Sequence, residues 1–352
     1  MIHALRLIRT PGVGPVTYRQ LIARFGSAEA AIAALPDLAR RGGGAVPRVP
    51  GEPEAQREIE RVRKIGGRHL FLDDPDYPGL LAQLDNAPVA LTVRGDLSLL
   101  ARPTVAMVGA RNASAAACRF ARTLAHDLAG EAVVVSGLAR GIDTAAHVGA
   151  LPATVAVIAG GLDNVYPPEN ADLQERIAAE ALLVAEMPPG TEPRARHFPH
   201  RNRIIAGLAL GTVVEAAPKS GSLITARLAG EAGREVMAVP GSPLDPRAQG
   251  CNQLIREGAV LVQNAADVLE QIRPIDARAV RSPGMRFDGA PPEDADEGTR
   301  RAVADLLGPV PVAVDELIRQ SGAAPAAVQM VLLELELAGR VERHAGGRVS
   351  LC

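Results

Sequence analysis

Short runs of hydrophobic residues, rich in Val and Ile, alternate with helical patterns through the middle of the chain. They occupy residues 89–93, 104–108, 132–135, 154–158, 182–185, 212–214 and 235–239. Strands that are apolar throughout and separated by helices are typical of a parallel sheet buried on both faces. The pattern therefore predicts a doubly wound α/β domain. Its ligand-binding loops should follow the carboxyl ends of the strands.

The first part of the chain has a helical pattern instead. Gly12, Gly14 and Pro15 form a turn that starts a helix ending at Gly26, and Ser27 is placed to cap another helix. Glu54 to Lys64 has the pattern of a charged surface helix. Between these helices, Gly42-Gly43-Gly44 and the prolines that follow have the composition of a flexible spacer.

The end of the chain predicts a small separate domain. Residues 273–297 contain four prolines and a terminal acidic run, a composition typical of a linker. Three short helices, near 299–307, 314–320 and 325–338, precede two β runs at 340–343 and 348–351, which Gly346-Gly347 joins. Three helices and a hairpin make a winged-helix topology. The predicted organisation is a helical module at 1–66, the α/β domain at 67–272, the linker, and the winged helix at 298–352.

Composition excludes several classes of protein. Among 352 residues, 47% are hydrophobic and 22% are charged, which fits a folded globular chain. The sequence has neither a membrane-helix pattern nor a signal peptide, so the cytoplasm is the expected compartment. Three widely spaced cysteines make no disulfide framework or zinc motif, and neither a metal nor a cofactor is expected.

Charge is unevenly distributed although the formal net charge is only −2. Residues 1–72 hold twelve basic and six acidic side chains, a net +6, whereas residues 101–272 are close to neutral. No predicted domain has the basic excess of a protein that coats duplex DNA by charge alone. Anion binding would therefore depend on local clusters.

Two loops after adjacent predicted strands have the composition of phosphate cradles. Gly109, Arg111 and Ser114 stand between a strand and a helix N-terminus, where free backbone N–H groups and the helix dipole favour anions. The next strand is followed by a second such loop, 136–143. It offers Ser136, Gly137, Arg140, Gly141 and Asp143, with Asp143 placed to cap the helix or to hold Arg140. His147 fits a packed histidine better than a catalytic base.

Two further clusters are basic. Residues 194–203 hold four arginines and two histidines with no acid, the pattern of a segment that follows a polyanion backbone. Phe198 could stack on a base, although aromatic residues make up only 2% of the chain. Beyond the next strand, Lys219, Ser220, Gly221 and Ser222 open a helix and form an anion seat. No nucleophile elbow or Ser/His/Asp order accompanies these loops, which favours binding over catalysis.

Taken together, these loops resemble the DprA (Smf) family of bacterial DNA-processing proteins. The resemblance covers the whole chain and is strongest over residues 70–272. It is carried by VAMVGARNAS (105–114), VVVSGLARGIDTAAHVGAL (133–151), TVAVIAGGLDNVYPPEN (154–170), HFPHRNRIIAGL (197–208), KSGSLITA (219–226) and GCNQLIREGA (250–259), preceded by YPGLLAQLDNAPVALTVRGD (77–96).

The resemblance implies an extended Rossmann-like domain that binds single-stranded DNA. It also implies a non-enzymatic protein that loads the recombinase RecA in natural transformation and forms a homodimer through the later part of that domain. The N-terminal module would be of the SAM or helix-hairpin-helix type. Carried over by motif, the candidate DNA-contacting residues are Gly109, Arg111, Ser114, Ser136, Gly137, Arg140, Gly141, Asp143, Arg201, Asn202, Arg203, Lys219, Ser220, Gly221 and Ser222.

Two departures from the family pattern bear on function. Ala115-Ala116-Ala117 replaces an aromatic residue and a glycine after Ser114. The third C-terminal helix has no Arg or Lys before Arg340, so we expect this winged helix to make protein contacts or weak DNA contacts. Two alternatives stay open: an enzyme that hydrolyses nucleotide phosphates, and a nucleotide sensor that signals through the winged helix.

Overall fold

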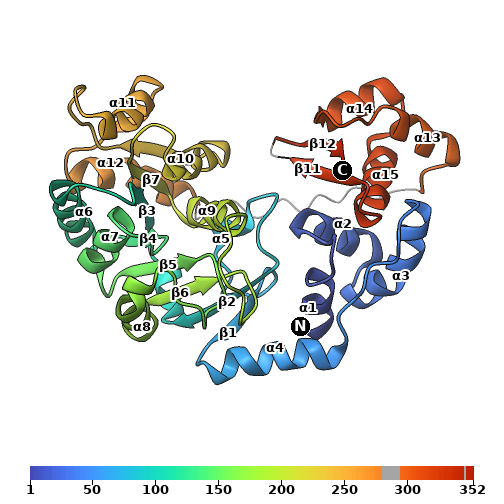
Figure 1. The fold of residues 1–352 in the computed structure, drawn as a ribbon, viewed down its shortest axis with the longest axis horizontal. Coiled ribbons are helices and arrows are strands. Elements are labelled where there is room, and N and C mark those ends of the chain that lie inside the picture. The colour runs from blue at the N-terminus through green and yellow to red at the C-terminus, as the bar shows by residue number, and fades with distance from the viewer. Residues whose placement is uncertain (280–293, 345) are drawn as a thin grey trace. The chain divides into compact units, whose positions relative to one another are not determined.

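The computed structural model describes residues 1–279, 294–344 and 346–352, with the side chains of 212–214 and 273–279 excepted. Contacts divide the chain into two compact units, Met1–Gln56 with Arg286–Cys352, and Arg57–Met285. The first unit is thus built from both ends of the chain (Figure 1). Among the described residues, no helix is long and apolar enough to cross a membrane.

The larger unit contains a nine-stranded sheet in the order β1-β2-β6-β5-β4-β3-β7-β8-β9. Its seven strands from β6 to β9 in that order run parallel, whereas β1 and β2 pair antiparallel at one edge. The strands are β1 (Arg68–Phe71), β2 (Ala90–Gly95), β3 (Thr104–Gly109), β4 (Val133–Ser136), β5 (Thr154–Ile158), β6 (Leu182–Ala185), β7 (Gly211–Glu215), β8 (Glu235–Ala238) and β9 (Val260–Leu261). The predicted doubly wound, mostly parallel sheet is confirmed. Its edge strands β1 and β9 were not predicted.

Along β3 and β4, alternate residues enter two separate apolar clusters, so both faces of these strands are buried. Val133 and Val135 belong to the first cluster, while Val134 belongs to the second. The same alternation holds along β3, where Ala106 faces the first cluster and Met107 the second. Burial on both faces explains why these strands are apolar at every position.

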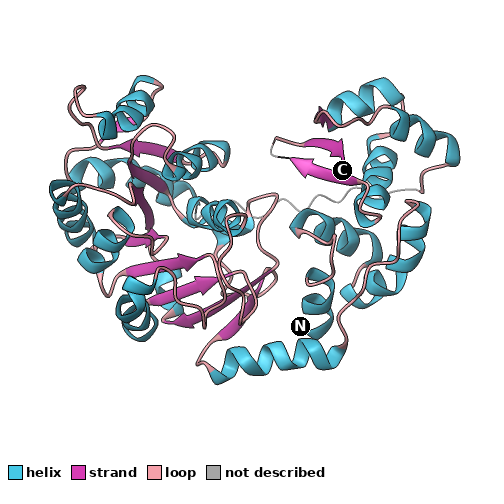
Figure 2. Cartoon of the chain, viewed as in Figure 1, coloured by secondary structure: helices cyan, strands magenta, loops and turns pink. Residues whose placement is uncertain are grey.

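Helices pack on both sides of the sheet (Figure 2) and add residues to both clusters. The first cluster takes residues from α8 (Ala171–Glu180), α9 (His197–Leu208) and α10 (Gly221–Glu231), and the second from α6 (Ala115–Leu128), α7 (Ile142–Ala150) and α12 (Ala265–Ala279). Shorter helices complete the unit: α5 (Gly79–Ala82), α11 (Gln249–Arg256), and 3₁₀ turns at Leu97–Ala101, Pro168–Asn170 and Pro246–Ala248.

The smaller unit combines an N-terminal helical module with the winged helix. The module consists of α1 (Ile2–Ile8), α2 (Pro15–Phe25) and α3 (Ala28–Arg41). The next helix, α4 (Glu52–Lys64), contains the boundary between the two units. As predicted, Gly26 ends α2 in the left-handed conformation, and the Ser27 hydroxyl accepts a hydrogen bond from Ala30 N at 3.1 Å to cap α3.

The predicted winged helix is also confirmed. It comprises α13 (Glu297–Asp305), β10 (Val312–Ala313), α14 (Val314–Ser321), α15 (Pro325–Leu337), β11 (Val341–His344) and β12 (Arg348–Leu351), with sheet order β10-β12-β11. The linker was predicted at 273–297. In the structure α12 continues to Ala279 and α13 begins at Glu297, so the segment between these helices is shorter than predicted. Its residues 280–293 lie outside the described part of the chain.

The expectation that Gly42-Gly43-Gly44 is a flexible spacer is wrong. Gly42 ends α3 with helical dihedral angles, and its backbone packs directly against α15. The absence of side chains at this segment reflects close packing between two helices rather than freedom of the chain.

Candidate functional site

The candidate residues of the larger unit gather at the carboxyl edge of the parallel sheet. Strand order reverses beside β3, which lies between β4 and β7, and this creates a topological switch point. Gly109 at the end of β3 is paired with Glu215 at the end of β7. Loops that follow β3, β4, β5, β6 and β7 therefore open at one edge, where doubly wound sheets bind ligands (Figure 1).

Arg201 lies at the centre of this edge although it is almost fully buried. Its Nη1 donates a hydrogen bond to Val157 O at 3.4 Å and lies 4.0 Å from Asp143 Oδ2, while its Nε has no hydrogen-bond partner. Burial lowers the pKa of Arg201 to about 10, with Asp143 acting in the opposite direction. Burial likewise raises the pKa of Asp143, although Arg201 opposes the shift. Arg201 thus holds its positive charge in a desolvated position, with Asp143 beside it.

At two positions in the loop after β4, neighbouring atoms come so close that only glycine fits. A Cβ on Gly137 would lie 1.2 Å from Arg201 Nη1, so the arginine occupies the space that a side chain would need. Gly141 has a φ of +76°, and its Cβ would lie 2.2 Å from Ala110 O. The loop after β4 is thereby packed against both α9 and the loop after β3.

Two guanidinium groups lie close to the ring of Phe198. Arg111 lies over its ring with Cζ 5.1 Å from the centroid, and Arg201 Cζ lies 5.9 Å away. Tyr166 approaches the same ring edge-on, with centroids 5.6 Å apart, and is nearly half exposed. These two aromatic rings, with Arg201, Gly137 and Asn164, help to line a small pocket. The arrangement combines cations with π-faces, the two features that recognise nucleotides without regard to base identity.

Lys219 is exposed in the loop after β7. It has a φ of +62°, an unusual conformation for a residue with a side chain. Ser220 caps α10, with its Oγ 2.7 Å from the hydroxyl oxygen of Ser222. A Cβ on Gly221 would touch nothing within 4 Å. The start of α10 therefore places the exposed Lys219 beside the capping hydroxyl of Ser220, whereas Ser222 is buried.

His147 and Asn170 hold the loop after β4 through hydrogen bonds to its backbone. Leu138 is buried with a φ of +54°. Its backbone N–H donates to His147 Nε2 at 3.3 Å, and its carbonyl accepts from Asn170 Nδ2 at 2.9 Å. Burial lowers the pKa of His147 to about 3. His147 is thus a neutral, packed residue, as expected.

Several predicted contact residues are engaged inside the protein. Ser136 is fully buried and donates to Met107 O at 2.6 Å. Arg203 donates to Asn86 O at 2.6 Å and to Glu186 Oε1 at 2.5 Å. Ser114 caps α6, while Asn202 lies half-buried beside Arg201. Of the four arginines in the basic run at 194–203, only Arg194 and Arg196 are exposed.

Asp143 neither caps α7 nor holds Arg140, the two alternatives that the sequence left open. Asp143 Oδ2 accepts from Ala139 N at 3.3 Å and faces Arg201. Arg140 points outward and forms an ion pair with Glu169 at 2.6 Å, in which both side chains are well exposed. The first turn of α7 therefore directs its carboxylate into the protein, toward α9.

Sequence reasoning missed three residues of this edge: Tyr166, Asn170 and Glu215. The first two lie in the segment after β5, a strand that pairs with β4 and ends at the same edge of the sheet. Glu215 Oε2 is buried without a hydrogen-bond partner, and burial raises the pKa of Glu215 to about 7 against the opposing charge of Arg247. Nothing in the sequence distinguishes this glutamate from an ordinary surface carboxylate. Among the described residues, no cluster of His, Cys, Asp or Glu could hold a metal ion.

Comparison with protein families gives three matches along the chain. The profile of DNA recombination-mediator protein A matches residues 68–273. The DprA-like N-terminal HHH domain matches residues 1–60, and the DprA winged helix domain matches residues 288–347.

Individual proteins agree with these matches. DNA processing protein DprA of Streptococcus pneumoniae is 48% identical over 60% of this chain and 80% of its own length. Protein Smf of Synechocystis is 34% identical over 96% of this chain and 95% of its own. Among solved structures, DprA from S. pneumoniae has a TM-score of 0.62 at 38% identity, covering 73% of this chain and 87% of that one. A Helicobacter pylori DprA structure, described as showing a single-stranded DNA binding mode, has a TM-score of 0.54 at 30% identity over 59% of this chain and 96% of that one.

Proposed function

Because the chain belongs to the DprA (Smf) family of DNA-processing proteins, we propose that its carboxyl sheet edge binds single-stranded DNA. In this proposal the protein is not an enzyme. It protects the incoming strand during natural transformation and loads RecA onto it. The related H. pylori protein, whose structure is described in terms of single-stranded DNA binding, supports this assignment.

One observation carries the proposal: Arg111 and Arg201 both lie over the ring of Phe198, and Tyr166 approaches its edge. Single-stranded DNA exposes both its phosphates and the faces of its bases, and this cluster offers a partner for each. Arg111 is exposed and can form a charge-assisted contact with a phosphate. Tyr166 and Phe198 provide aromatic surface for a base. In duplex DNA the base faces are stacked on one another, so a duplex could contact only the arginines of this cluster, through its phosphates.

A second phosphate contact is assigned to the start of α10. Lys219 is exposed there beside Ser220, whose hydroxyl caps the helix. Gly109 and Glu215 are paired across β3 and β7, so this seat and the loop of Arg111 follow neighbouring strands. A strand of DNA running across the switch point would meet both. The contacts are to backbone phosphates and base faces, so we expect binding to depend little on base sequence.

The state of the titratable groups supports a binding role. His147 uses both ring nitrogens inside the protein, since Nε2 accepts from Leu138 N and Nδ1 lies 2.7 Å from the Thr154 hydroxyl. Asp143 is buried against Arg201. Neither group is placed to activate a nucleophile at the surface.

The proposed partners are RecA and a second copy of this chain. We assign the dimer contact to the later part of the larger unit, which includes residues 250–259. Size measurement of the purified protein by light scattering tests the dimer. RecA filament growth on a strand already covered by single-strand-binding protein tests the loading role.

A competition experiment separates this function from the nucleotide alternatives. The protein is bound to a labelled single strand and challenged with unlabelled single strand, duplex of equal length, or nucleoside monophosphates. Displacement by the single strand alone supports the proposal. Displacement by a monophosphate, with release of free base, would identify a nucleotide-hydrolysing enzyme. Displacement without base release would identify a nucleotide sensor.

A further inference from the structure

In the smaller unit, helix α15 has buried apolar residues on more than one of its faces. Val328, Val331, Leu332 and Leu335 enter the core of the winged helix. Met330, Leu333 and Leu337 are equally buried but lie outside that core cluster. A helix that is buried on more than one face has a second packing partner.

That partner is the N-terminal module of the same chain. Gly42, at the end of α3, comes so close to α15 that a Cβ there would lie 2.1 Å from Glu334 O. A Cβ on Gly44 would lie 2.4 Å from the Cα of Ala338. Gly12, in the turn before α2, faces the last turn of α15, with Glu336 O at 3.6 Å from its ideal Cβ position. Glycines at these positions let two backbones approach without intervening side chains.

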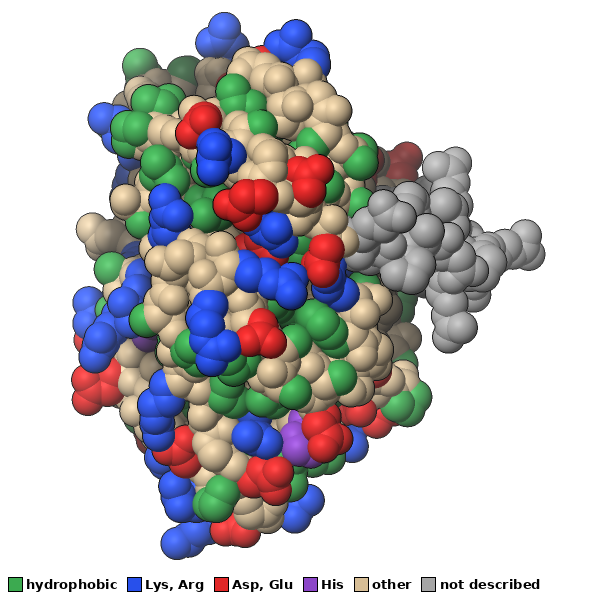
Figure 3. Space-filling view, turned by 90° about the vertical axis from the view of Figure 1, so that its right-hand side faces the viewer, with side chains coloured by type: hydrophobic (Ala, Val, Ile, Leu, Met, Phe, Trp, Pro, Cys, Tyr) green, Lys and Arg blue, Asp and Glu red, His purple; other side chains and the backbone are tan. Residues whose placement is uncertain are grey.

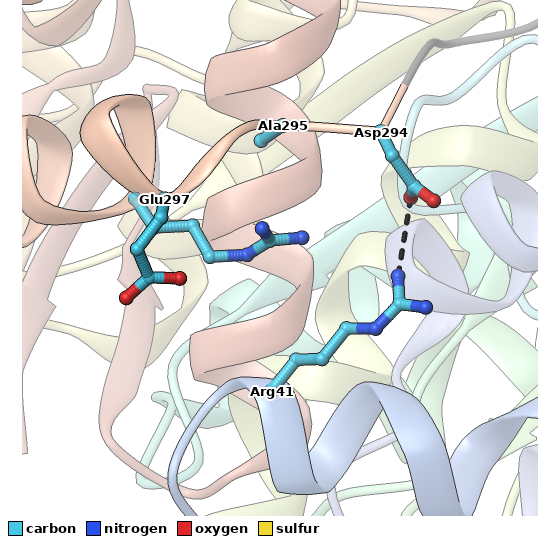
Figure 4. A pocket seen from close by; sticks show the side chains of 5 residues that line it. Arg41, Asp294, Ala295 and Glu297 are labelled. Atoms are coloured by element: carbon cyan, nitrogen blue, oxygen red, sulfur yellow. Dashed lines mark hydrogen bonds and ion pairs between the residues drawn. The ribbon is translucent and has the colours of Figure 1, made fainter.

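Polar contacts fix the same docking. Gln20 Nε2 donates to Gln329 Oε1 at 3.1 Å, and Arg340 Nη1 donates to Gly42 O at 3.4 Å. Arg24 and Arg41 both bind Asp294, which precedes α13. Figure 4 shows Arg41 extending from α3 to that carboxylate, across a pocket of about 240 Å³ that Glu297 and Arg300 also line.

All three polar side chains of α15 are occupied within this unit. Gln329 binds Gln20, and Glu334 accepts two hydrogen bonds from Arg300 at 2.8 and 3.0 Å. Glu336 accepts from Arg343 Nε at 2.9 Å. In a winged helix that reads duplex DNA, the third helix brings cations or amides to the major groove. Here the corresponding helix has no cation, and its single amide is already used.

Over the middle of the face shown in Figure 3, basic and acidic side chains of the described residues intermingle. A duplex-binding surface would need an excess of one sign.

We propose that α15 is a protein-docking helix, whose partner is the surface formed by Gly12, Gly42 and Gly44 of the same chain. The winged helix therefore closes over the N-terminal module instead of reading duplex DNA, and the two ends of the chain fold as one unit. This role is separate from single-stranded DNA binding by the sheet edge.

Gly42→Ala tests the docking in the full chain. Gly42 has a φ of −72°, so alanine adds no backbone strain and acts only through its contact with α15. We expect hydrogen exchange of the α15 amides to rise on the order of tenfold. Gly14→Ala and Gly308→Ala are matched controls, since a Cβ at either position meets nothing within 4 Å. Equal exchange in Gly42→Ala and the controls would overturn the proposal.

Duplex binding provides the second readout of the same variant. If α15 is a docking helix, loosening it leaves duplex affinity unchanged. A gain of duplex affinity in Gly42→Ala would mean that the contact hides a DNA-reading helix, which contradicts the proposed role.

A cross-link tests the contact without disturbing its glycines. Gln20→Cys and Gln329→Cys are introduced together in a chain whose Cys118 and Cys352 are replaced by serine, leaving the buried Cys251. A short bismaleimide should join positions 20 and 329 within one chain, as mass spectrometry of the monomer would show. No link, or links between two copies only, would contradict docking within the chain.

Discussion

Gly137 and Arg201 fit together only as a pair, because a Cβ on the glycine would lie 1.2 Å from Nη1 of the arginine. The arginine connects three parts of the site. It contacts Val157 O at the end of β5, Asp143 on α7 and the ring of Phe198 on its own helix. The absence of a side chain at Gly137 thus makes room for Arg201, which connects the loop after β4, the end of β5 and α9.

Gly137→Ala is expected to displace Arg201. Asp143 would then be left in a buried position without its partner, at a cost of about 3 kcal/mol in the free energy of unfolding. Single-stranded DNA affinity should fall at least about tenfold, because Phe198 loses one of its flanking cations. Denaturant unfolding and fluorescence anisotropy measure the two effects. Gly130→Ala is the control, since a Cβ there meets nothing within 4 Å; equal behaviour of the two variants would contradict the role given to this contact.

Arg111→Ala should remove one phosphate contact without destabilising the fold. Arg111 is exposed, and its described contact is with the ring of Phe198. For single strands, the slope of log K against log salt should become shallower by about 0.7. The measurement is a salt titration of the variant beside wild type. Arg176→Ala, which removes an exposed arginine paired with Glu180 on α8, should leave the slope unchanged.

Arg203→Ala, in contrast, should lower stability and leave the salt dependence of binding unchanged. Arg203 is buried against Glu186 and Asn86 O, so its removal takes away an ion pair and a buried hydrogen bond and lowers stability by roughly 3 kcal/mol. The salt slope of the fraction that remains folded should equal that of wild type. A shallower slope in a stable Arg203→Ala protein would show that Arg203 contacts DNA directly.

Phe198→Leu should weaken binding without changing its salt dependence. Leucine keeps the apolar volume near Arg111 and Arg201 but removes the ring that both cations face. Loss of one stacked base costs about 1–3 kcal/mol, which anisotropy detects as a change in Kd at every salt concentration. Tyr166→Phe keeps the ring at the neighbouring position and should bind as wild type. An unchanged Kd for Phe198→Leu would exclude stacking on this ring.

Glu215 should make stability depend on pH. Burial raises its pKa to about 7 from the ordinary value of 4.5, so the folded chain binds this proton more tightly than the unfolded chain. Stability due to Glu215 is therefore fully present below pH 4.5 and is lost as the pH rises through 7. Glu215→Gln has no carboxyl to ionise and does not lose this stability. The Tm of the variant relative to wild type should therefore rise as the pH increases from about 5 to about 8.

The comparison of the two proteins isolates this carboxyl. His147 contributes a slope of opposite sign, because its lowered pKa of about 3 makes the folded chain release a proton below 6.5. That contribution is common to both proteins and cancels in the difference. Glu175→Gln, which removes a well-exposed carboxylate, controls for loss of charge. A constant difference in Tm across this pH range would contradict the burial of Glu215.

The sequence predicted the parallel sheet because each central strand is apolar on both faces, as Val133, Val134 and Val135 illustrate. It predicted the start of α10 and the cap at Ser27 because these depend on a few adjacent residues. The edge strands were missed because their local pattern is weak. β9 has only two residues, and β1 begins with the polar Arg68 and His69, which are not fully buried. Each of the two strands pairs with a single neighbour.

Within the site, the sequence identified the right loops but not the state of each side chain. Arg201 and Arg203 look like surface cations in a run of basic residues, and only tertiary packing shows that both are buried. Gly42 looks like part of a spacer, because glycine serves both flexible chain and close helix packing. Contacts between residues far apart in the chain decide such cases, and no local pattern encodes them.

The most direct test of the account is fluorescence anisotropy of the full chain with a labelled oligo-dT of about 35 nucleotides, repeated with duplex of equal length and at several salt concentrations. We predict tight binding to the single strand, with a slope near −0.7 per phosphate contact, and much weaker binding to the duplex. Equal affinity for both forms, or no binding by folded protein at low salt, would contradict the assignment of this sheet edge to single-stranded DNA.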